Sequence, residues 1–370
     1  MSDIYGWQNE VWRKLAGPLG HALLLRGRKG LGKLAFARYL AKSRLCENPS
    51  VEGKACEACA SCHWFEQGSH PDFCVVEPEA ATSGSEEGTG EEDVETGDKA
   101  EAQPFPKVAN QPTGSGKSAK KPSRQISISQ IRELGDFVNI TSHQNGYKII
   151  LIHPAETMNT AAANALLKNL EEPPLQTLFI LVTHQAQYLL PTLRSRCRQI
   201  AMPVPDAASA ALWLKQQGVK APERCLASAG YAPLTALEFA NEDYLARHSA
   251  FIQQISAPSS FNVLALAEEM QKSDLVMVVG WLQKWCYDLM SFRMAQKVRY
   301  HLDMLAQIKS LAFRLDPHSM AAYLRILDKM QQLARHPLNP RLFLEELLFS
   351  YIAALPALSG SRRGRDDKRG

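Results

Sequence analysis

Short apolar runs alternate with helical patterns through the first 200 residues of the chain. Continuous apolar segments at His21–Arg26, Tyr147–Ile152 and Leu178–Thr183 have the length and composition of buried strands. Two further segments, Lys33–Leu45 and Thr157–Pro174, carry apolar residues at helical spacing. Strands that alternate with helices form a parallel sheet with helices packed on both faces. The pattern therefore predicts an α/β domain.

The pattern becomes almost wholly helical after about residue 203. Amphipathic stretches follow one another from there to Leu358, and the final residues, GSRRGRDDKRG, are polar. Changes near Met202–Pro205 and Asn241–Ser256 indicate two domain boundaries. The predicted parts are an α/β domain at 1–203, a small helical domain at 204–243, a second helical domain at 244–358 and a disordered tail at 359–370.

The α/β domain is interrupted at 79–124 by a segment of biased composition. Nine acidic residues and one lysine lie between Glu79 and Pro104, and the remainder has five basic residues and no acid. Such segregated charge predicts a disordered insertion. The segment contains TGSGKS at Thr113–Ser118, which resembles the end of a phosphate-binding loop. Gln111 stands where that loop needs its first glycine and no strand precedes it, so we do not expect phosphate binding there.

Composition narrows the class of protein without identifying a function. The 370 residues are 45% hydrophobic and 22% charged, which is typical of a soluble globular chain. A net charge of +4 is too small to indicate nucleic-acid binding by itself. The N-terminus has no apolar signal region, and no run approaches the ~20 apolar residues of a membrane-spanning helix. We therefore expect a cytoplasmic protein with no membrane contact.

The stretch LLRGRKGLGKLAFA, Leu24–Ala37, resembles a phosphate-binding loop that lacks one group. The candidate phosphate-binding residues are Gly27, Gly30, Gly32 and Lys33. In an active loop, backbone amides and the lysine bind the phosphates, and a following Ser or Thr hydroxyl holds magnesium. Leu34 stands at the hydroxyl position and cannot hold magnesium. We expect no ATP hydrolysis, whereas weak nucleotide binding and a glycine turn retained only for packing both stay open.

A second position supports the loss of hydrolysis. An NTPase of this kind places an acid at the end of the second strand to position magnesium, and a neighbouring Glu to polarise water. His153 and Pro154 occupy these two positions, and neither can do that work at pH 7. Glu156 lies two residues further on, and we expect it to open the next helix, where acidic residues are favourable.

Four cysteines with the spacing C-x9-C-x2-C-x2-C indicate a metal site within residues 46–62. These candidate ligands are Cys46, Cys56, Cys59 and Cys62. Four thiolates suit tetrahedral zinc and leave no open coordination position, so the zinc would be structural. The alternative is that the thiols are free and buried. Three nearby residues could substitute as ligands: His63, His70 and Cys74.

Three arginines alternate along Pro191–Ile200, which follows the third predicted strand: Arg194, Arg196 and Arg198. They could form a solvated edge. Alternatively, one of them could project from the domain to reach the γ-phosphate of a nucleotide held by a neighbouring subunit. An arginine supplied in this way can raise a rate by roughly a thousandfold or more.

Several motifs, taken in order, resemble those of clamp-loader subunits of bacterial DNA polymerase III, which belong to the AAA+ family. They are HALLLRGRKGLGK, the four cysteines, HPDF at His70–Phe73, ANALLKNLEEPP at Ala163–Pro174, LRSRC at Leu193–Cys197 and HPLNPRLFLEELL at His336–Leu348. The resemblance covers nearly the whole chain apart from the insertion and the tail. It implies an AAA+ module with a zinc-binding insertion, a helical lid domain and an all-α C-terminal collar domain.

The resemblance also implies roles for individual residues. In Ser195-Arg196-Cys197, Arg196 would be the arginine finger that completes the ATP site of an adjacent γ/τ subunit. The four cysteines would be the zinc ligands. Thr183 is similar to a sensor residue of active members, whereas the lid sequence GYAPLTAL, Gly230–Leu237, lacks the arginine that active members carry.

The implied function is that of a non-motor stator in a hetero-oligomeric component of the DNA polymerase III holoenzyme. With γ/τ and δ subunits, it would help to load the sliding clamp onto primed DNA, and its DNA contacts would be to backbone phosphates. Two other functions stay open. One is an active clamp-loader ATPase, which Leu34 and His153 argue against; the other is a zinc-ribbon nucleic-acid-binding protein, which would bind DNA alone with a steep salt dependence.

Overall fold

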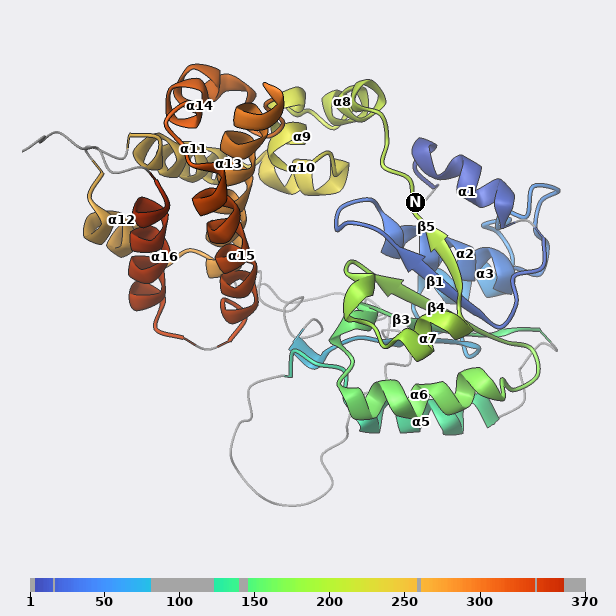
Figure 1. The fold of residues 1–370 in the computed structure, drawn as a ribbon. Coiled ribbons are helices and arrows are strands. Elements are labelled where there is room, and N and C mark those ends of the chain that lie inside the picture. Colours follow the sequence, from blue (N-terminus) through green and yellow to red (C-terminus); the bar gives the residue numbers. More distant parts are fainter. Residues whose placement is uncertain are drawn as a thin grey trace, which may run out of the picture. The chain divides into compact units, whose positions relative to one another are not determined.

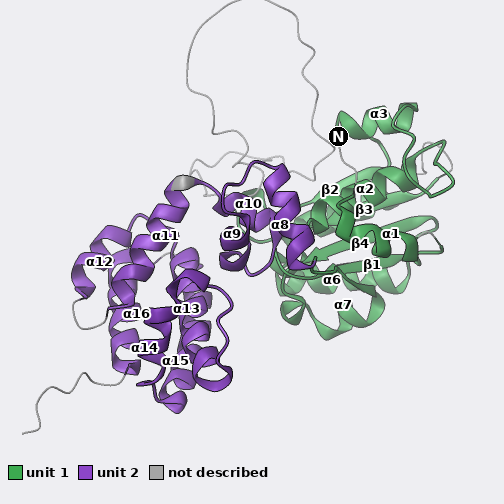
Figure 2. Cartoon of the chain, turned by 90° about the horizontal axis from the view of Figure 1, so that it is seen from above, with its two compact units in different colours: residues 1–205 green, residues 206–370 purple. Residues whose placement is uncertain are grey.

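The computed structural model describes residues 4–15, 17–80, 123–139, 146–257, 261–336 and 338–355. Two compact units divide the chain, Met1–Pro205 and Asp206–Gly370 (Figure 2). Most of the predicted insertion, the TGSGKS segment within it and the predicted tail lie outside the described residues.

The first unit is built on a parallel sheet of five strands in the order β2-β3-β4-β1-β5 (Figure 1). The strands are β1 (Ala22–Arg26), β2 (Phe73–Val76), β3 (Lys148–Ile152), β4 (Thr177–Thr183) and β5 (Arg198–Ala201). Three of them, β1, β3 and β4, confirm the three predicted strands. The two edge strands were not predicted, because β2 has only four residues and β5 reads RQIA and is mostly exposed.

Helices cover the sheet, as the alternating pattern predicted. Those of the first unit are α1 (Asn9–Lys14), α2 (Lys33–Leu45), α3 (Ala60–Glu66), α5 (Ile128–Asn139), α6 (Thr160–Glu171) and α7 (Pro191–Arg196), with 3-10 helices η1 (Gly6–Gln8), η2 (Ala155–Thr157) and η3 (Ala186–Tyr188). Alternate strand residues, such as Leu24 and Ile150, form one buried core with α5, α6 and α7. Helix α2 packs against β1, β3 and β4, and Figure 1 shows it on the side of the sheet away from α5 and α6.

The described part of the second unit is helical, again as predicted. Its elements are α8 (Ala207–Gln216), α9 (Pro222–Ser228), α10 (Pro233–Phe239), α11 (Glu242–Ile255), α12 (Val263–Met270), α13 (Leu275–Ala295), η4 (Leu302–Met304), α14 (Leu305–Ala312), α15 (Pro317–Leu333) and α16 (Pro340–Ala354). One small core joins α8, α9 and α10, and a larger one surrounds α13. The predicted boundary at 243/244 stays a prediction. Among the described helices, none is long and apolar enough to cross a membrane.

Two tryptophans of α13 organise the larger core. The Trp281 indole donates to the Tyr244 hydroxyl at 2.6 Å, and the Trp285 indole donates to the Tyr351 hydroxyl at 2.8 Å. Both rings are fully buried. Because each polar N–H finds a partner inside the core, these large side chains can be buried without an unsatisfied donor.

A buried carboxylate in α13 fixes the segment that follows this helix. Asp288 is fully buried and accepts backbone N–H bonds from Arg299, Tyr300 and His301. Its Oδ2 also lies 2.9 Å from Nδ1 of the His301 ring. These contacts satisfy a charge that would otherwise be costly to bury, and they hold the turn before η4.

We predict that Asp288→Ala lowers the free energy of unfolding of the chain by about 3–5 kcal/mol, because it leaves several buried donors without an acceptor. Chemical denaturation followed by circular dichroism measures this loss. Asp328→Ala is the matched control, since Asp328 is exposed and accepts one bond from Gln283 at 3.1 Å. It should change stability by less than about 0.5 kcal/mol. Equal effects of the two variants would contradict the role given to Asp288.

Candidate functional site

The glycine loop joins β1 to α2, which is the strand–loop–helix context that the sequence predicted. Gly27, Gly30 and Gly32 have φ values of 152°, 82° and 79°. At Gly32 the close approach of another segment adds to this restriction, since a Cβ there would lie 2.6 Å from ring carbons of Tyr5. The loop therefore depends on glycine for both its backbone conformation and its packing.

Lys33 is the first residue of α2 and is 2% exposed. Its ammonium group donates to the Arg28 carbonyl, which belongs to the same loop. Burial lowers the pKa of Lys33 to about 8, while the negative charge of Glu156 opposes that shift. A phosphate that reached Lys33 would have to compete with a partner supplied by the loop itself.

The N-terminal segment packs directly on the glycine loop, which sequence reasoning missed. Gln8 donates from its amide to the carbonyls of Leu31 and Gly32, at 2.9 and 3.2 Å. The Trp7 indole donates to the Leu31 carbonyl at 3.3 Å, and its ring stacks on Tyr5 with centroids 4.8 Å apart. The sequence offered only Tyr5 and Trp7 on either side of Gly6 as a sign of this packing. Such a pattern is too common to predict a contact with the glycine loop. These contacts fix the loop from outside the sheet.

An imidazole follows each of the strands β3 and β4, and the one after β3, His153, stands where an active ATPase would carry an acid. His153 follows the last residue of β3, and its Nδ1 lies 3.2 Å from a carboxylate oxygen of Glu77, which follows β2. The His153 ring meets the His184 ring edge to face, with centroids 5.4 Å apart. Thr183, the candidate sensor, is fully buried and its hydroxyl accepts the Gln185 N–H at 3.1 Å.

Glu156 does not open α6, so that expectation is wrong. It lies in η2, a separate one-turn 3-10 helix, whereas α6 is capped by Asn159, whose side chain accepts the Ala162 N–H at 2.8 Å. The short Asn159 side chain can accept an N–H from the first turn of its own helix, so α6 is capped without Glu156.

The Glu156 carboxylate instead points toward the loop after β4. One oxygen accepts the His184 N–H at 3.0 Å, and the other is buried with no hydrogen-bond partner among the described residues. Burial, with the positive charge of Lys33, lowers the pKa of His184 to about 3, so this imidazole is neutral at pH 7. Glu156 and Lys33 thus lie close enough to influence each other's charge at this site.

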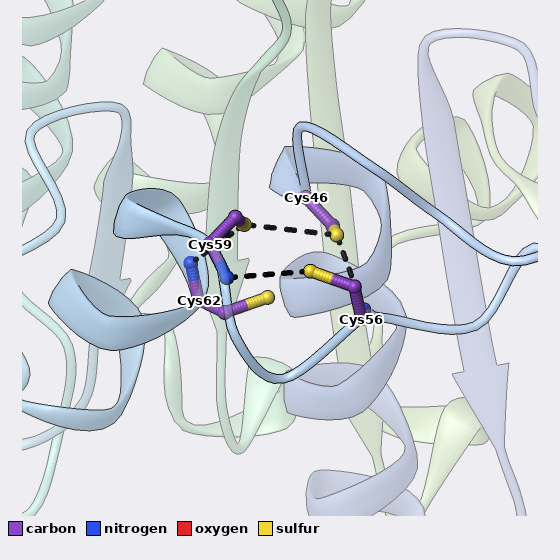
Figure 3. A group of neighbouring side chains, drawn as sticks. All are labelled: Cys46, Cys56, Cys59 and Cys62. Atoms are coloured by element: carbon purple, nitrogen blue, oxygen red, sulfur yellow. Dashed lines mark hydrogen bonds between the residues drawn. The ribbon is translucent and has the colours of Figure 1, made fainter.

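The four predicted cysteine ligands come together at the end of α2 (Figure 3). Cys46 caps the C-terminus of α2, Cys56 lies in the following loop, and Cys59 and Cys62 begin α3. Their sulfur atoms all lie within 4.8 Å of one another, and those of Cys46 and Cys59 are 3.9 Å apart. A tetrahedral zinc with Zn–S bonds of about 2.3 Å requires sulfurs about 3.8 Å apart. The cluster therefore fits a metal such as zinc.

Backbone amides favour the thiolate form of Cys56, whereas burial raises the pKa values of the Cys46 and Cys62 thiols. The Cys59 N–H donates to Cys56 Sγ at 3.3 Å, and the Cys56 N–H donates to Cys46 Sγ at 3.2 Å. The amides of Ala58 and Cys59 lower the pKa of the Cys56 thiol to about 6. Glu57 adopts the left-handed conformation, with φ at 64°, which turns the chain between two ligands.

The three possible substitute ligands lie outside this cluster. His70 is buried, with Nε2 2.9 Å from the Ser61 hydroxyl and Nδ1 accepting the Asp72 N–H at 3.1 Å. Cys74 lies in the core of β2, where burial raises its thiol pKa to about 12. His63 is exposed on α3.

The three candidate arginines lie in different surroundings. Arg196 ends α7, and its side chain is 36% exposed. Its guanidinium lies 2.6 Å from a carboxylate oxygen of Glu171 and donates to the Thr192 carbonyl at 3.1 Å. Arg198 donates to the Pro18 carbonyl at 3.0 Å, and the carbonyl of Arg194 accepts from the Gln199 amide at 3.2 Å.

Comparison with known proteins gives the family. A family model described as DNA polymerase III, delta subunit, matches residues 10–206, and one described as the C-terminal part of that subunit matches 242–352. DNA polymerase III subunit delta′ of Pseudomonas aeruginosa is 32% identical over 96% of this chain and 99% of its own length. The chain belongs to the delta′ (δ′) subunit family of DNA polymerase III.

Other δ′ relatives extend this likeness. The subunit from Yersinia pestis is 30% identical over 95% of this chain and 96% of its own length, and that from Escherichia coli is 26% identical over 86% of both. Membership of the δ′ family confirms the predicted resemblance to clamp-loader subunits of DNA polymerase III. The parallel sheet, the cysteine cluster and the helical second unit agree with the fold that the resemblance implied.

We predict that this δ′ chain, purified without chelator, contains about one zinc ion, because four thiolates complete a tetrahedral site. Cys59→Ser should remove most of the zinc and lower the thermal unfolding midpoint, since metal binding contributes directly to folding. Elemental analysis and thermal denaturation measure the two effects. Cys74→Ala is the control and should keep its zinc even if the loss of core packing lowers stability. Zinc loss in Cys74→Ala, or none in Cys59→Ser, would show that the ligand set is wrong.

Proposed function

We propose that this chain is the stator of the clamp loader. It would hold its place in a ring with γ/τ and δ subunits and supply Arg196 to the ATP site of an adjacent γ/τ subunit. In that position it would help the complex to load the sliding clamp onto primed DNA. The observation that carries the proposal is that one chain has both features: a partly exposed arginine, Arg196, and a glycine loop without the hydroxyl and the acids that hold magnesium in an active ATPase.

The local site supports a chain that does not hydrolyse ATP. Leu34 offers no hydroxyl for magnesium, and the end of β3 offers His153 and Pro154 in place of acids. Lys33 already donates to a loop carbonyl. The lid sequence Gly230–Leu237 contains no arginine. The sequence thus departs from the active pattern at four points: Leu34, His153, Pro154 and the missing lid arginine.

The placement of Arg196 supports a role outside its own subunit. It lies at the end of α7 with part of its guanidinium exposed, and its contacts come from α6 and α7. Arginine suits this task because its charge is permanent and its planar fork can bind two phosphate oxygens. The zinc cluster would be structural, because four thiolates leave no position for a substrate.

We expect the purified chain alone to show no magnesium-dependent ATP turnover. A coupled steady-state assay of the isolated chain checks this expectation, with an active γ-type subunit as the positive control. Turnover comparable to that of the positive control would reject the stator proposal and favour an active clamp-loader ATPase.

We expect Arg196→Ala, placed in the assembled complex, to slow hydrolysis at the adjacent γ/τ site by roughly a thousandfold, because it removes the positive charge that stabilises the transition state. In single-turnover ATP hydrolysis by the complex, the loss at this one site should appear as a slow phase beside the unaffected sites. Arg198→Ala is the control, since Arg198 bonds to Pro18 of its own subunit. Normal hydrolysis and clamp loading with Arg196→Ala would show that Arg196 is not the finger.

A nucleic-acid-binding zinc ribbon is the second candidate. It requires tight DNA binding by the isolated chain, with an affinity that falls steeply as salt increases. The stator proposal expects weak binding alone and co-purification with the other loader subunits. Titration of the isolated chain with primed DNA at two salt concentrations separates the two functions.

A further inference from the structure

The ends of α6 and α7 meet through one ion pair. Glu171 is the last residue of α6, and Arg196 is the last residue of α7. A carboxylate oxygen of Glu171 lies 2.6 Å from a terminal nitrogen of Arg196, and the two side chains are 48% and 36% exposed. The contact joins the motif LEEPP, which contains Glu171, to the motif SRC, which contains Arg196. The two residues are 25 positions apart in the sequence.

We propose that Glu171 is a positioning residue for Arg196: it holds the guanidinium in the orientation that reaches the nucleotide of the neighbouring subunit. This inference rests on the proposed function, in which Arg196 acts in trans. Glu171 itself touches no nucleotide in this proposal and acts only through Arg196.

The guanidinium is fixed by two anchors on its two terminal nitrogens. One nitrogen donates to the Thr192 carbonyl at 3.1 Å, one helical turn earlier, and the other pairs with Glu171. Two anchors define the plane of the group, whereas a single one would leave it free to rotate. An arginine has five N–H donors, so two contacts leave three for phosphate oxygens. Orientation before the partner arrives reduces the entropy that must be lost at the reaction step.

The backbone beneath Glu171 is well suited to hold such an anchor. Leu166 and Leu170 of α6 are buried in the core against the sheet. Pro173 and Pro174 follow the C-cap residue Glu172 and restrict the chain beyond the helix. The carboxylate therefore projects from a rigid helix end rather than from a flexible loop.

The ion pair orients Arg196 without sequestering it. Both side chains are substantially exposed, and water and salt screen such pairs. A triphosphate carries several negative charges and can bind the remaining N–H donors of Arg196. Glu171 meanwhile stays paired with one terminal nitrogen of Arg196. Loss of Glu171 should therefore slow hydrolysis, whereas loss of a sequestering partner would accelerate it.

The chain provides a matched control one residue away. Glu172 has the same charge, is exposed and forms the C-cap of α6, but Arg196 pairs with Glu171. If the rate depended only on surface charge near the subunit interface, loss of either glutamate would change it alike. If Glu171 positions Arg196, only the loss of Glu171 should change the rate.

The experiment compares Glu171→Ala, Glu171→Gln, Glu172→Ala and Arg196→Ala in the complete complex with γ/τ and δ subunits, clamp and primed DNA. We expect Glu171→Ala to lower kcat at the γ/τ site that Arg196 completes roughly tenfold with little change in KM, because a small misplacement of a catalytic group is costly in rate. Glu171→Gln should recover most of this loss, since its amide oxygen still accepts from the guanidinium. Glu172→Ala should match the unaltered complex.

Complex assembly by size-exclusion chromatography and thermal midpoints establish that each variant folds and joins the ring. In the double variant Glu171→Ala with Arg196→Ala, kcat should equal that of Arg196→Ala alone, and a further loss would overturn the inference. Unchanged or faster turnover with Glu171→Ala, beside a defective Arg196→Ala, would also overturn it and leave the finger assignment standing. Normal turnover with Arg196→Ala would instead reject the proposed function and this inference with it.

Discussion

Parallel pairing of the five strands is the constraint from which the rest of the first unit follows. Because all strands run in one direction, the segments that leave their carboxyl ends meet at one edge of the sheet. The glycine loop after β1, Glu77 after β2, His153 after β3 and His184 after β4 are brought together in this way. Residues more than a hundred positions apart thus form one site.

Several groups at this edge find partners within the chain, although one Glu156 oxygen and His184 Nδ1 have none among the described residues. Lys33 donates to the carbonyl of Arg28, Glu156 accepts from the amide of His184, and burial keeps the His184 ring neutral. In an active ATPase, by contrast, clustered acids require magnesium to offset their charge. His153 and Pro154, which occupy those positions here, add no negative charge.

The sequence predicted the parts of this structure that depend on local pattern. Apolar runs revealed β1, β3 and β4, and the close spacing of Cys56, Cys59 and Cys62 revealed the metal cluster because its ligands are neighbours in the chain. It did not reveal β5, whose RQIA sequence is polar and becomes a strand only by pairing with β1.

The sequence likewise did not predict contacts between distant segments. The packing of Gln8 on Gly32 and the pairing of Glu171 with Arg196 depend on how helices and loops meet after folding. Glu156 was assigned to the start of the next long helix for a related reason: the sequence did not show that a separate 3-10 helix, η2, precedes α6, which is capped by Asn159.

Helix α2 connects the glycine loop to the cysteine cluster. Its 13 residues begin at Lys33 and end beside Cys46, so the two sites are about 20 Å apart on one rigid element. Tyr5 and Gln8 hold the first end, and a metal bound by the four cysteines would hold the second. Near the second end, Lys42 is buried and pairs with Glu57 and Glu66 at 3.2 and 2.6 Å. Since metal binding contributes to folding, a metal bound by this cluster would stabilise α2. The N-terminal segment at one end of α2 and a metal at the other would in this way keep the glycine loop in a fixed form.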